Sequence, residues 1–426
     1  MDKRKDTLMG QTKLSVKGRD FYINGKLVYD EVDVDDHSKG LLMNARFIQG
    51  IFDDQFDRKR YNRFGKIFNP DQHTDDFIAA LPEWYNYGLR AVTVGMQGGM
   101  PVFTMDIRTV DHNPFGPDGK IFDQAYAKRL DKIIQAADKL GMVVIVNILY
   151  WAQALRLNND ETIIDVLKSA CYFLKNGHYT NIIIDVANEY NIDMWNDLKM
   201  IQNPKSMKNL IELVREESGG MLVGSSGGGG LVDQEVVDAS DVVLIHGNGL
   251  TRGEYYDFVL KVQKMAPNKP ILCNEDSPCI SRLDIAQLTH TSWGHYDNFT
   301  KQEPPCDWGI TKGQDFFFAR RMASVLGIEL KELCLEDQFY LQGLEPNTSW
   351  NGRRWIRLAA EYPEKINYVN FYRNGVFIYR SYDELFFMYR ETTWIQKPWI
   401  VKKDDKTWTA EIVLHDGTTL IKTQTV

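Results

Sequence analysis

Two glutamates end two apolar segments of this chain, and carboxyl groups in such positions can do acid–base and nucleophilic chemistry. Residues 181–190 read Asn-Ile-Ile-Ile-Asp-Val-Ala-Asn-Glu-Tyr, a β-branched run that closes with Asn188 and Glu189. Residues 269–276 read Lys-Pro-Ile-Leu-Cys-Asn-Glu-Asp and bring Glu275 to a similar place. An ionised glutamate is rarely fully buried, so we expect each carboxylate to open into a pocket at the carboxyl end of its strand.

Such a pair suits the cleavage of a glycosidic bond. A retaining glycosidase uses one carboxylic acid to protonate the leaving oxygen and a second carboxylate, about 5–5.5 Å away, to attack the anomeric carbon. If the sheet closes into a barrel, Glu189 and Glu275 both point into one site at its carboxyl face. The alternative interpretation is two unrelated glutamates at strand ends of an acidic protein.

The elements that must position these residues alternate along most of the chain. Apolar runs predict strands at 45–52, 90–97, 142–151, 181–190, 221–225, 242–246 and 269–276, with a short eighth strand ending near Trp293. Helical spacing of apolar residues predicts helices at 75–87, 123–140, 161–175, 206–217, 281–290 and 314–326. Eight strands joined through helices predict an α/β fold, the closed (β/α)8 or TIM barrel.

The two ends of the chain have a different residue pattern. Asn24-Gly25 lies between two β-rich runs and predicts an N-terminal hairpin. From about residue 335 the pattern changes to short alternating runs with turns, which predicts an all-β sandwich resembling an immunoglobulin domain. We therefore expect a catalytic domain over residues 1–334 and a sandwich domain over residues 335–426.

Tryptophans are frequent in the expected sandwich. They could form a glycan-binding face, but tryptophan is also common in sandwich cores and interfaces, so we expect a structural role. The residues are Trp350, Trp355, Trp394, Trp399 and Trp408.

The order of these elements resembles that of the clan A glycoside hydrolases, over roughly residues 15–330. Barrels of that superfamily carry an Asn-Glu pair after the fourth strand and a glutamate after the seventh, the places of Asn188-Glu189 and Glu275 in this sequence. The resemblance implies that Glu189 is the acid/base, that Glu275 is the nucleophile, and that Asn188 binds the sugar 2-hydroxyl.

The same resemblance implies further site residues. His246 follows the sixth strand, where such enzymes often place a residue that orients the nucleophile, and Trp293 corresponds to an aromatic floor beneath the reacting sugar. A structural histidine and a core tryptophan are the alternatives. The sequence departs from the pattern at the second strand, where many members have an arginine that touches the nucleophile. This chain has Thr93 there, and Arg90 comes too early in the strand.

Other residues near strand ends could line a sugar site. Gln97 ends the second strand, and Tyr150 and Trp151 end the third, although ordinary loop packing explains them equally well. A polar loop at 98–122, rich in Gly, Pro and Asp, follows the second strand, and we place it over the site because loops of this length usually have a role.

Composition restricts the partners. The formal net charge of -8 argues against nonspecific nucleic-acid binding, which needs a basic face. No stretch approaches the apolar length of a membrane span. The five cysteines include no CxxC pair, and the eight histidines form no HExxH motif, so we expect no catalytic metal and no cofactor. The cellular compartment and the oligomeric state stay open.

Together these features predict a glycoside hydrolase that cleaves a poly- or oligosaccharide with retention of configuration. The alternative is a noncatalytic carbohydrate-binding barrel, which would not need the two glutamates to be close. A metal-dependent barrel hydrolase is a third possibility.

Overall fold

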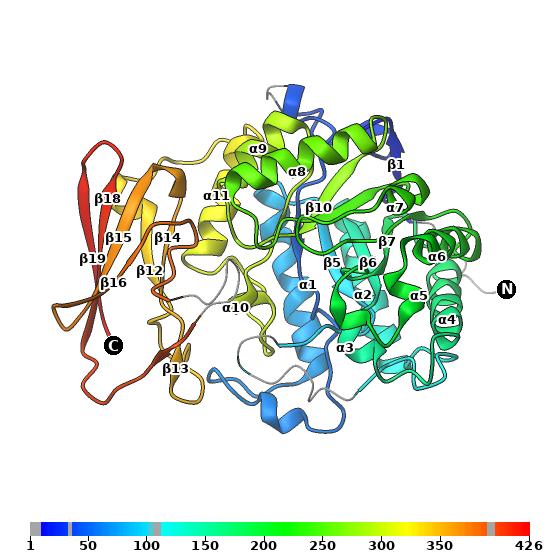
Figure 1. Ribbon diagram of the computed structural model, residues 1–426, viewed down its shortest axis with the longest axis horizontal. Coiled ribbons are helices and arrows are strands. Elements are labelled where there is room, and N and C mark those ends of the chain that lie inside the picture. Colours follow the sequence, from blue (N-terminus) through cyan, green and yellow to red (C-terminus); the bar gives the residue numbers. More distant parts are fainter. Residues whose placement is uncertain (1–9, 33–35, 102–103, 105–111, 390–396) are drawn as a thin grey trace.

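A parallel β-barrel forms the centre of the larger part of the protein (Figure 1). The computed structural model describes residues 10–32, 36–101, 104, 112–389 and 397–426. One sheet has the order β11-β4-β5-β6-β7-β8, and β9 pairs with β10. The strands are β4 (Asn44–Arg46), β5 (Ala91–Gly95), β6 (Val143–Leu149), β7 (Ile182–Ala187), β8 (Leu222–Gly224), β9 (Val243–His246), β10 (Ile271–Glu275) and β11 (Gly294–His295).

Backbone hydrogen bonds join these two sheets into a ring. Asp241, just before β9, donates its N–H to the carbonyl of Val223 in β8 at 2.8 Å. On the other side, the N–H of Cys273 in β10 donates to the carbonyl of Ser292 at 2.9 Å, and Ser292 donates back to Ile271 at 3.1 Å. The predicted (β/α)8 barrel is therefore confirmed.

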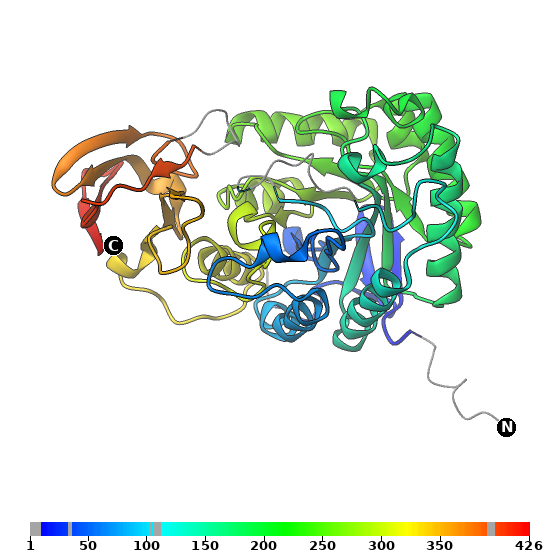
Figure 2. The ribbon, with the colours of Figure 1, turned by 90° about the horizontal axis from the view of Figure 1, so that it is seen from below.

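Helices surround the barrel, as Figures 1 and 2 show. The longer ones are α1 (Pro70–Asn86), α2 (Gln124–Leu140), α4 (Thr162–Asn176), α6 (Pro204–Glu217), α8 (Arg252–Met265) and α11 (Gln314–Val325). The shorter ones are α3 (Trp151–Ala154), α5 (Lys199–Gln202), α7 (Gln234–Ala239), α9 (Arg282–Thr289) and α10 (Asn298–Lys301). The β-branched interiors of β6 and β7 are fully buried because helices cover the sheet from outside.

Capping residues explain where the helices differ from the sequence prediction. Helix α1 begins at Pro70, earlier than the predicted residue 75, because the Asn69 side chain accepts hydrogen bonds from the next backbone N–H groups. Helix α8 was not predicted at all, although Thr251 and Glu254 form a capping box at its start. Both starts carry signals that are local and polar, and apolar periodicity alone does not detect them.

The first barrel strand is shorter than predicted. Strand β4 ends at Arg46, whereas the apolar run suggested a strand over 45–52. After Phe47 the chain turns, with Gly50 donating to the carbonyl of Phe47 and Phe52 to that of Gln49. These residues are buried in spite of being outside the strand, so their apolar character reflects packing.

The N-terminal segment covers the opposite end of the barrel from the two glutamates. Strands β1 (Leu14–Lys17), β2 (Asp20–Ile23) and β3 (Lys26–Leu27) form a small antiparallel sheet, with the predicted turn at Asn24-Gly25. Both turn residues have positive φ, 54° and 76°, which is the geometry of a tight two-residue hairpin turn.

The C-terminal part consists of antiparallel β structure with its own apolar cluster. Strands β15 (Ile366–Arg373), β16 (Val376–Ser381), β18 (Thr407–Leu414) and β19 (Thr419–Thr425) form a sheet of order β16-β15-β18-β19. The remaining strands pair as β12 (Phe339–Gln342) with β14 (Arg357–Ala360), and β13 (Arg353–Arg354) with β17 (Trp399–Ile400). The domain boundary at residues 334/335 and the immunoglobulin likeness stay predictions.

Of the tryptophans that the structure describes in this part, Trp399 and Trp408 pack inside it, whereas Trp350 and Trp355 contact Phe64 and Phe299 of the larger part. Trp355, Trp399 and Trp408 are buried, and Trp350 is half-buried beside Phe64. Trp394 lies outside the described residues. In the described helices, none is long and apolar enough to cross a membrane.

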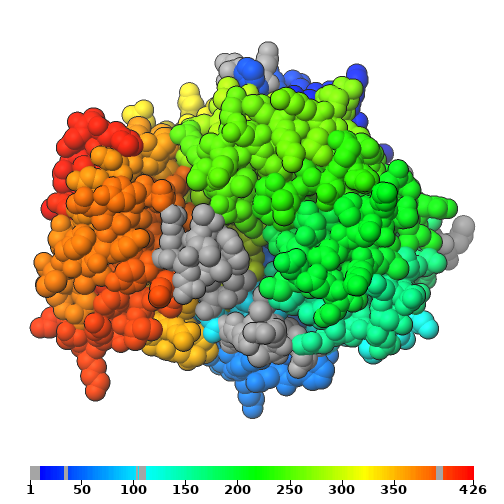
Figure 3. Space-filling model, in the orientation of Figure 1, coloured from blue at the N-terminus to red at the C-terminus, as the bar shows by residue number. Residues whose placement is uncertain are grey.

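Ion pairs and hydrogen bonds fasten the C-terminal part to the barrel, against which it packs (Figure 3). Arg357 of β14 pairs with Asp297 at 2.5 Å, and Arg321 of α11 pairs with Glu364 at 2.8 Å. Glu384 accepts the backbone N–H of Ser281 at 3.0 Å and also its hydroxyl, at the start of α9. Burial raises the pKa of Glu384 from 4.5 to about 7, and the Ser281 hydrogen bonds offset only part of that effect.

This raised pKa predicts a pH-dependent stability. The folded state keeps the Glu384 proton where the unfolded state loses it, so the contribution is fully present below pH 4.5 and is lost as the pH rises through about 7. Between pH 5 and pH 8, Glu384 should lower the unfolding free energy of the wild type by at most about 3 kcal/mol. The Glu384→Gln variant should lack this part of the decrease, measured by urea unfolding. Glu332→Gln, at an exposed position, is the control. A wild-type slope in Glu384→Gln would contradict the prediction.

Candidate active site

The two glutamates meet at the carboxyl end of the barrel. Glu189 follows β7, and Glu275 is the last residue of β10. A carboxylate oxygen of each and a ring nitrogen of His246 all lie within 4.8 Å of one another. The side chains of Glu189 and Glu275 are 19% and 10% exposed, so both carboxylates reach solvent from a largely buried setting.

Local backbone features aim both side chains inward. Glu189 has a φ of 51°, in the left-handed region that a glutamate seldom adopts, and its N–H donates to Ser226 Oγ at 3.4 Å. In β10 the register against β9 shifts between Cys273 and Glu275. Asn274 is the additional residue of β10 at this point. Because of it, the adjacent side chains of Asn274 and Glu275 both reach partners inside the barrel.

Glu275 is held by two side chains from neighbouring strand ends. Arg46 Nε lies 2.7 Å from Glu275 Oε2, and Asn248 donates from Nδ2 to Glu275 Oε1 at 2.6 Å. Arg46 also donates from Nη2 to Asn188 Oδ1 at 2.6 Å. One buried guanidinium therefore connects Glu275 to the asparagine beside Glu189, and the carboxylate of Glu275 has a fixed orientation.

His246 lies between the two glutamates. Its Nδ1 is 3.1 Å from Glu189 Oε1 and 3.7 Å from Glu275 Oε2, and the side chain has no exposed surface. Burial disfavours the imidazolium, but the nearby charges of Glu275 and Glu189 outweigh it, so the pKa of His246 is raised. A cation on His246 would draw the two carboxyl groups together.

A second polar layer supports the site from inside the barrel. Asp185 is fully buried on β7, four residues before Glu189, and burial raises the pKa of its carboxyl. It accepts the N–H and the hydroxyl of Ser226, each at 2.9 Å, and Asn274 Nδ2 at 3.3 Å. Because Ser226 also receives the N–H of Glu189, Asp185 fixes the serine that supports the unusual Glu189 backbone.

The other predicted lining residues have different surroundings. The ring of Tyr150 is nearly buried, and burial followed by the charge of Glu275 raises the pKa of its phenol. The Trp151 ring stacks on it with centroids 6.4 Å apart. Gln97 accepts the N–H of Tyr150 at 2.6 Å and donates to Asn113 at 3.0 Å, so its amide holds the third strand end and the loop after the second. Residues 102–103 and 105–111 of that loop lie outside the described residues.

Trp293 is placed differently from the predicted sugar floor. It is completely buried just before β11, its Nε1 donates to Asp276 Oδ2 at 2.8 Å, and its ring packs on Phe318 of α11. No ring face is exposed to a sugar. The indole instead fixes the aspartate that follows Glu275.

Sequence reasoning missed two residues that contact Glu275. Arg46 pairs in register with Thr93, so the arginine sought on the second strand comes from the first one. A single arginine inside a predicted apolar strand was the available signal. Asn248 follows His246 by two residues and lies in a turn, where no sequence pattern distinguished it.

Two clusters among the described residues have metal-ligand atoms close together, namely Glu189, His246 and Glu275, and His295, Asp297 and Asp315. Protein cations already engage both. Arg46 pairs with Glu275, and Lys301 Nζ lies 2.7 Å from Asp315 Oδ2. A metal cation would meet these positive charges at close range, so neither donor set fits a metal well.

Comparisons with known proteins agree with this architecture. Residues 70–227 match the model of the family Cellulase (glycosyl hydrolase family 5). No curated protein matches the chain. A solved structure described as a glycoside hydrolase is 13% identical with a TM-score of 0.50, covering 90% of this chain and 94% of its own. That similarity shows the fold.

Two further solved structures are more distant. The endo-β-1,4-mannanase from Thermotoga petrophila is 11% identical with a TM-score of 0.44, covering 90% of this chain and 97% of its own. β-Glucuronidase 2 from Bacteroides uniformis is 11% identical with a TM-score of 0.45, covering 97% of this chain and 48% of its own. The family match over residues 70–227, inside a (β/α)8 barrel with two glutamates at its carboxyl end, shows a glycoside hydrolase that resembles the clan A enzymes.

Proposed function

We propose that the protein hydrolyses an O-glycosidic bond of a poly- or oligosaccharide with retention of configuration. The observation that carries the proposal is the approach of the Glu189 and Glu275 carboxylates, one oxygen of each lying within 4.8 Å of the other. Retaining enzymes hold their carboxyl groups about 5–5.5 Å apart, whereas inverting enzymes leave about 6.5–9.5 Å for a water molecule. The short separation favours direct attack by a carboxylate.

In the proposed reaction Glu275 is the nucleophile and Glu189 the acid/base. Arg46 and Asn248 hold the Glu275 carboxylate in one orientation, as a nucleophile requires. Glu189 has no arginine partner among the described contacts, and its neighbour His246 bonds only one of its oxygens. Glu189 would protonate the leaving oxygen and then deprotonate the water that releases the sugar from Glu275.

The remaining residues would bind and orient the sugar. Asn188, which accepts a hydrogen bond from Arg46, would bind the 2-hydroxyl, and Tyr150 and Trp151, whose rings stack, would line the site. His246 would keep the glutamates in place, and Gln97 would do the same for Tyr150. Product release from a panel of aryl glycosides and polysaccharides, including β-1,4-glucans and mannans, would identify the sugar and linkage.

The two glutamates should respond differently to substitution. Glu275→Ala should abolish turnover of every substrate, because no covalent intermediate can form. Glu189→Ala should lose about 10²–10⁴-fold on substrates that need protonation, yet still give a burst with an activated aryl glycoside. Added azide should restore turnover in Glu189→Ala by attacking the intermediate from the vacated side.

Glu212→Ala, at an exposed position on α6, is the matched control and should keep the wild-type rate. Wild-type rates in both Glu275→Ala and Glu189→Ala on a true substrate would show that the assignment is wrong.

The arginine from β4 should be essential in a way that lysine cannot replace. A lysine offers one ammonium, which cannot pair with Glu275 and reach Asn188 in the same planar geometry. We expect Arg46→Lys to lower kcat/KM about 100-fold, a loss of about 2.7 kcal/mol in transition-state stabilisation. Thr93→Val changes the neighbour in register and should stay within about threefold of wild type. If a folded Arg46→Lys protein has steady-state rates near those of the wild type, Arg46 does not have this role.

Chelation separates this proposal from a metal-dependent hydrolase. Because Arg46 already neutralises Glu275, we expect full activity after incubation with EDTA and removal of the chelate. Loss of activity that a divalent cation restores would favour the metal-dependent alternative.

A further inference from the structure

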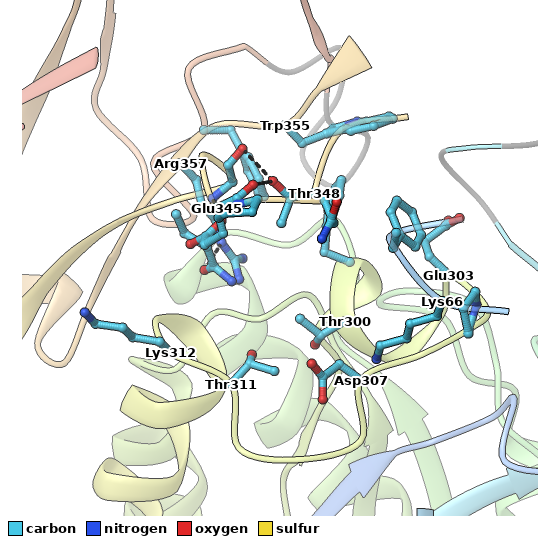
Figure 4. A pocket seen from close by; sticks show the side chains of 18 residues that line it. Lys66, Thr300, Glu303, Asp307, Thr311, Lys312, Glu345, Thr348, Trp355 and Arg357 are labelled. Carbon is cyan, nitrogen blue, oxygen red and sulfur yellow. Dashed lines mark hydrogen bonds between the residues drawn. The ribbon is translucent and has the colours of Figure 1, made fainter. Parts of the chain in front are cut away.

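A cavity of about 350 Å³ lies between the barrel and the C-terminal β structure, and neither Glu189 nor Glu275 lines it (Figure 4). Three parts of the chain enclose it. The loop after β4 supplies Lys66, the segment after β11 supplies Phe299 and Glu303, and the C-terminal part supplies Trp355 and Arg357. In Figure 4, Trp355 lies on one side of the space, with Lys66, Thr300 and Asp307 on the other.

The lining combines aromatic rings with balanced charge. Phe64, Phe299, Trp355 and Phe387 contribute rings, and the Phe299 and Trp355 centroids are 4.9 Å apart. The formal charges cancel, because the lining includes Lys66, Lys312 and Arg357 as well as Glu303, Asp307 and Glu345. A cavity with aromatic walls, several polar groups and no net charge suits a neutral ligand that carries many hydroxyl groups.

Some of its polar groups are fixed before any ligand arrives. Arg357 is 3% exposed, donates from Nε to Gln342 Oε1 at 2.9 Å and pairs through Nη2 with Asp297. Its Nη1 has no hydrogen-bond partner in the part of the chain that the structure describes. A buried donor of this kind is satisfied when a ligand or a water molecule occupies the cavity.

One segment connects this cavity with the glutamates. Residues 296–303 begin at Tyr296, whose ring centroid is 5.4 Å from the guanidinium carbon of Arg46. They continue to Gln302, whose carbonyl accepts from Gln49, and to Glu303 in the cavity wall. Segment 296–303 therefore runs from the catalytic centre to the wall of the cavity.

We infer that this cavity is a distal sugar-binding site, which takes one or two units of the same glycan whose cleavage is proposed at Glu189 and Glu275. The inference rests on the proposed function. The volume is at the small end of ligand pockets, about 300–1,000 Å³, which restricts the occupant to a short piece of the chain. Because barrel and C-terminal residues build it together, neither part alone provides the site.

Binding to the full-length chain with Glu275→Gln tests the inference without turnover. Cello- and manno-oligosaccharides of one to six units would be titrated by calorimetry. We expect affinity to rise with length and Phe299→Ala in this background to weaken the hexasaccharide about tenfold, with the disaccharide unchanged. Phe377→Ala, an exposed ring of β16 outside the cavity, is the matched control and should change neither affinity.

A second variant controls for misfolding of the Phe299→Ala protein. Lys66→Ala removes an exposed donor at the cavity and should weaken the hexasaccharide about threefold. Equal hexasaccharide affinity in both cavity variants and the parent, or no oligosaccharide binding at all, would overturn the inference. Failure of the proposed function would be seen separately, as wild-type rates in the two glutamate variants.

Discussion

The buried guanidinium of Arg46 is the interaction on which the rest of the site depends. It lies on β4, is shielded from solvent, and reaches Glu275 on β10 and Asn188 after β7. Placing an unpaired arginine inside a barrel would cost several kcal/mol in lost hydration, so the fold is favourable only when these carboxylate and amide partners are in place. Three strand ends are thereby fixed relative to one another by one charge.

Charge and hydrogen bonding inside the barrel follow from this constraint. His246 adds a second group that attracts the carboxylates, and burial raises the pKa of Asp185 beneath them. Asp185 is satisfied by Ser226 and Asn274, and Ser226 in turn supports the left-handed backbone of Glu189. The barrel interior is therefore polar where the reaction requires fixed side chains, and the surrounding helices keep it dry enough for these interactions to be strong.

The sequence predicted the parts of this arrangement that repeat along the chain. Apolar runs located β6, β7 and β10, and their abrupt polar ends identified Glu189 and Glu275. Arg46 escaped prediction because its role depends on the register between β4 and the strands around it, which no local pattern encodes. Trp293 had the right sequence position for a sugar platform, but burial against Phe318 depends on tertiary packing. Helix α8 was missed although Tyr255, Phe258, Val259 and Val262 repeat at helical spacing behind the polar cap at Thr251.

The central claim is that the closeness of the two carboxylates makes the reaction a double displacement through Glu275. The most direct test is proton NMR during the hydrolysis of a substrate that the enzyme cleaves. The spectrum gives the anomeric configuration of the first sugar released, before mutarotation changes it. The account predicts a product with the same anomeric configuration as the substrate. A first product of inverted configuration would contradict it, because inversion requires attack by a water molecule in place of Glu275.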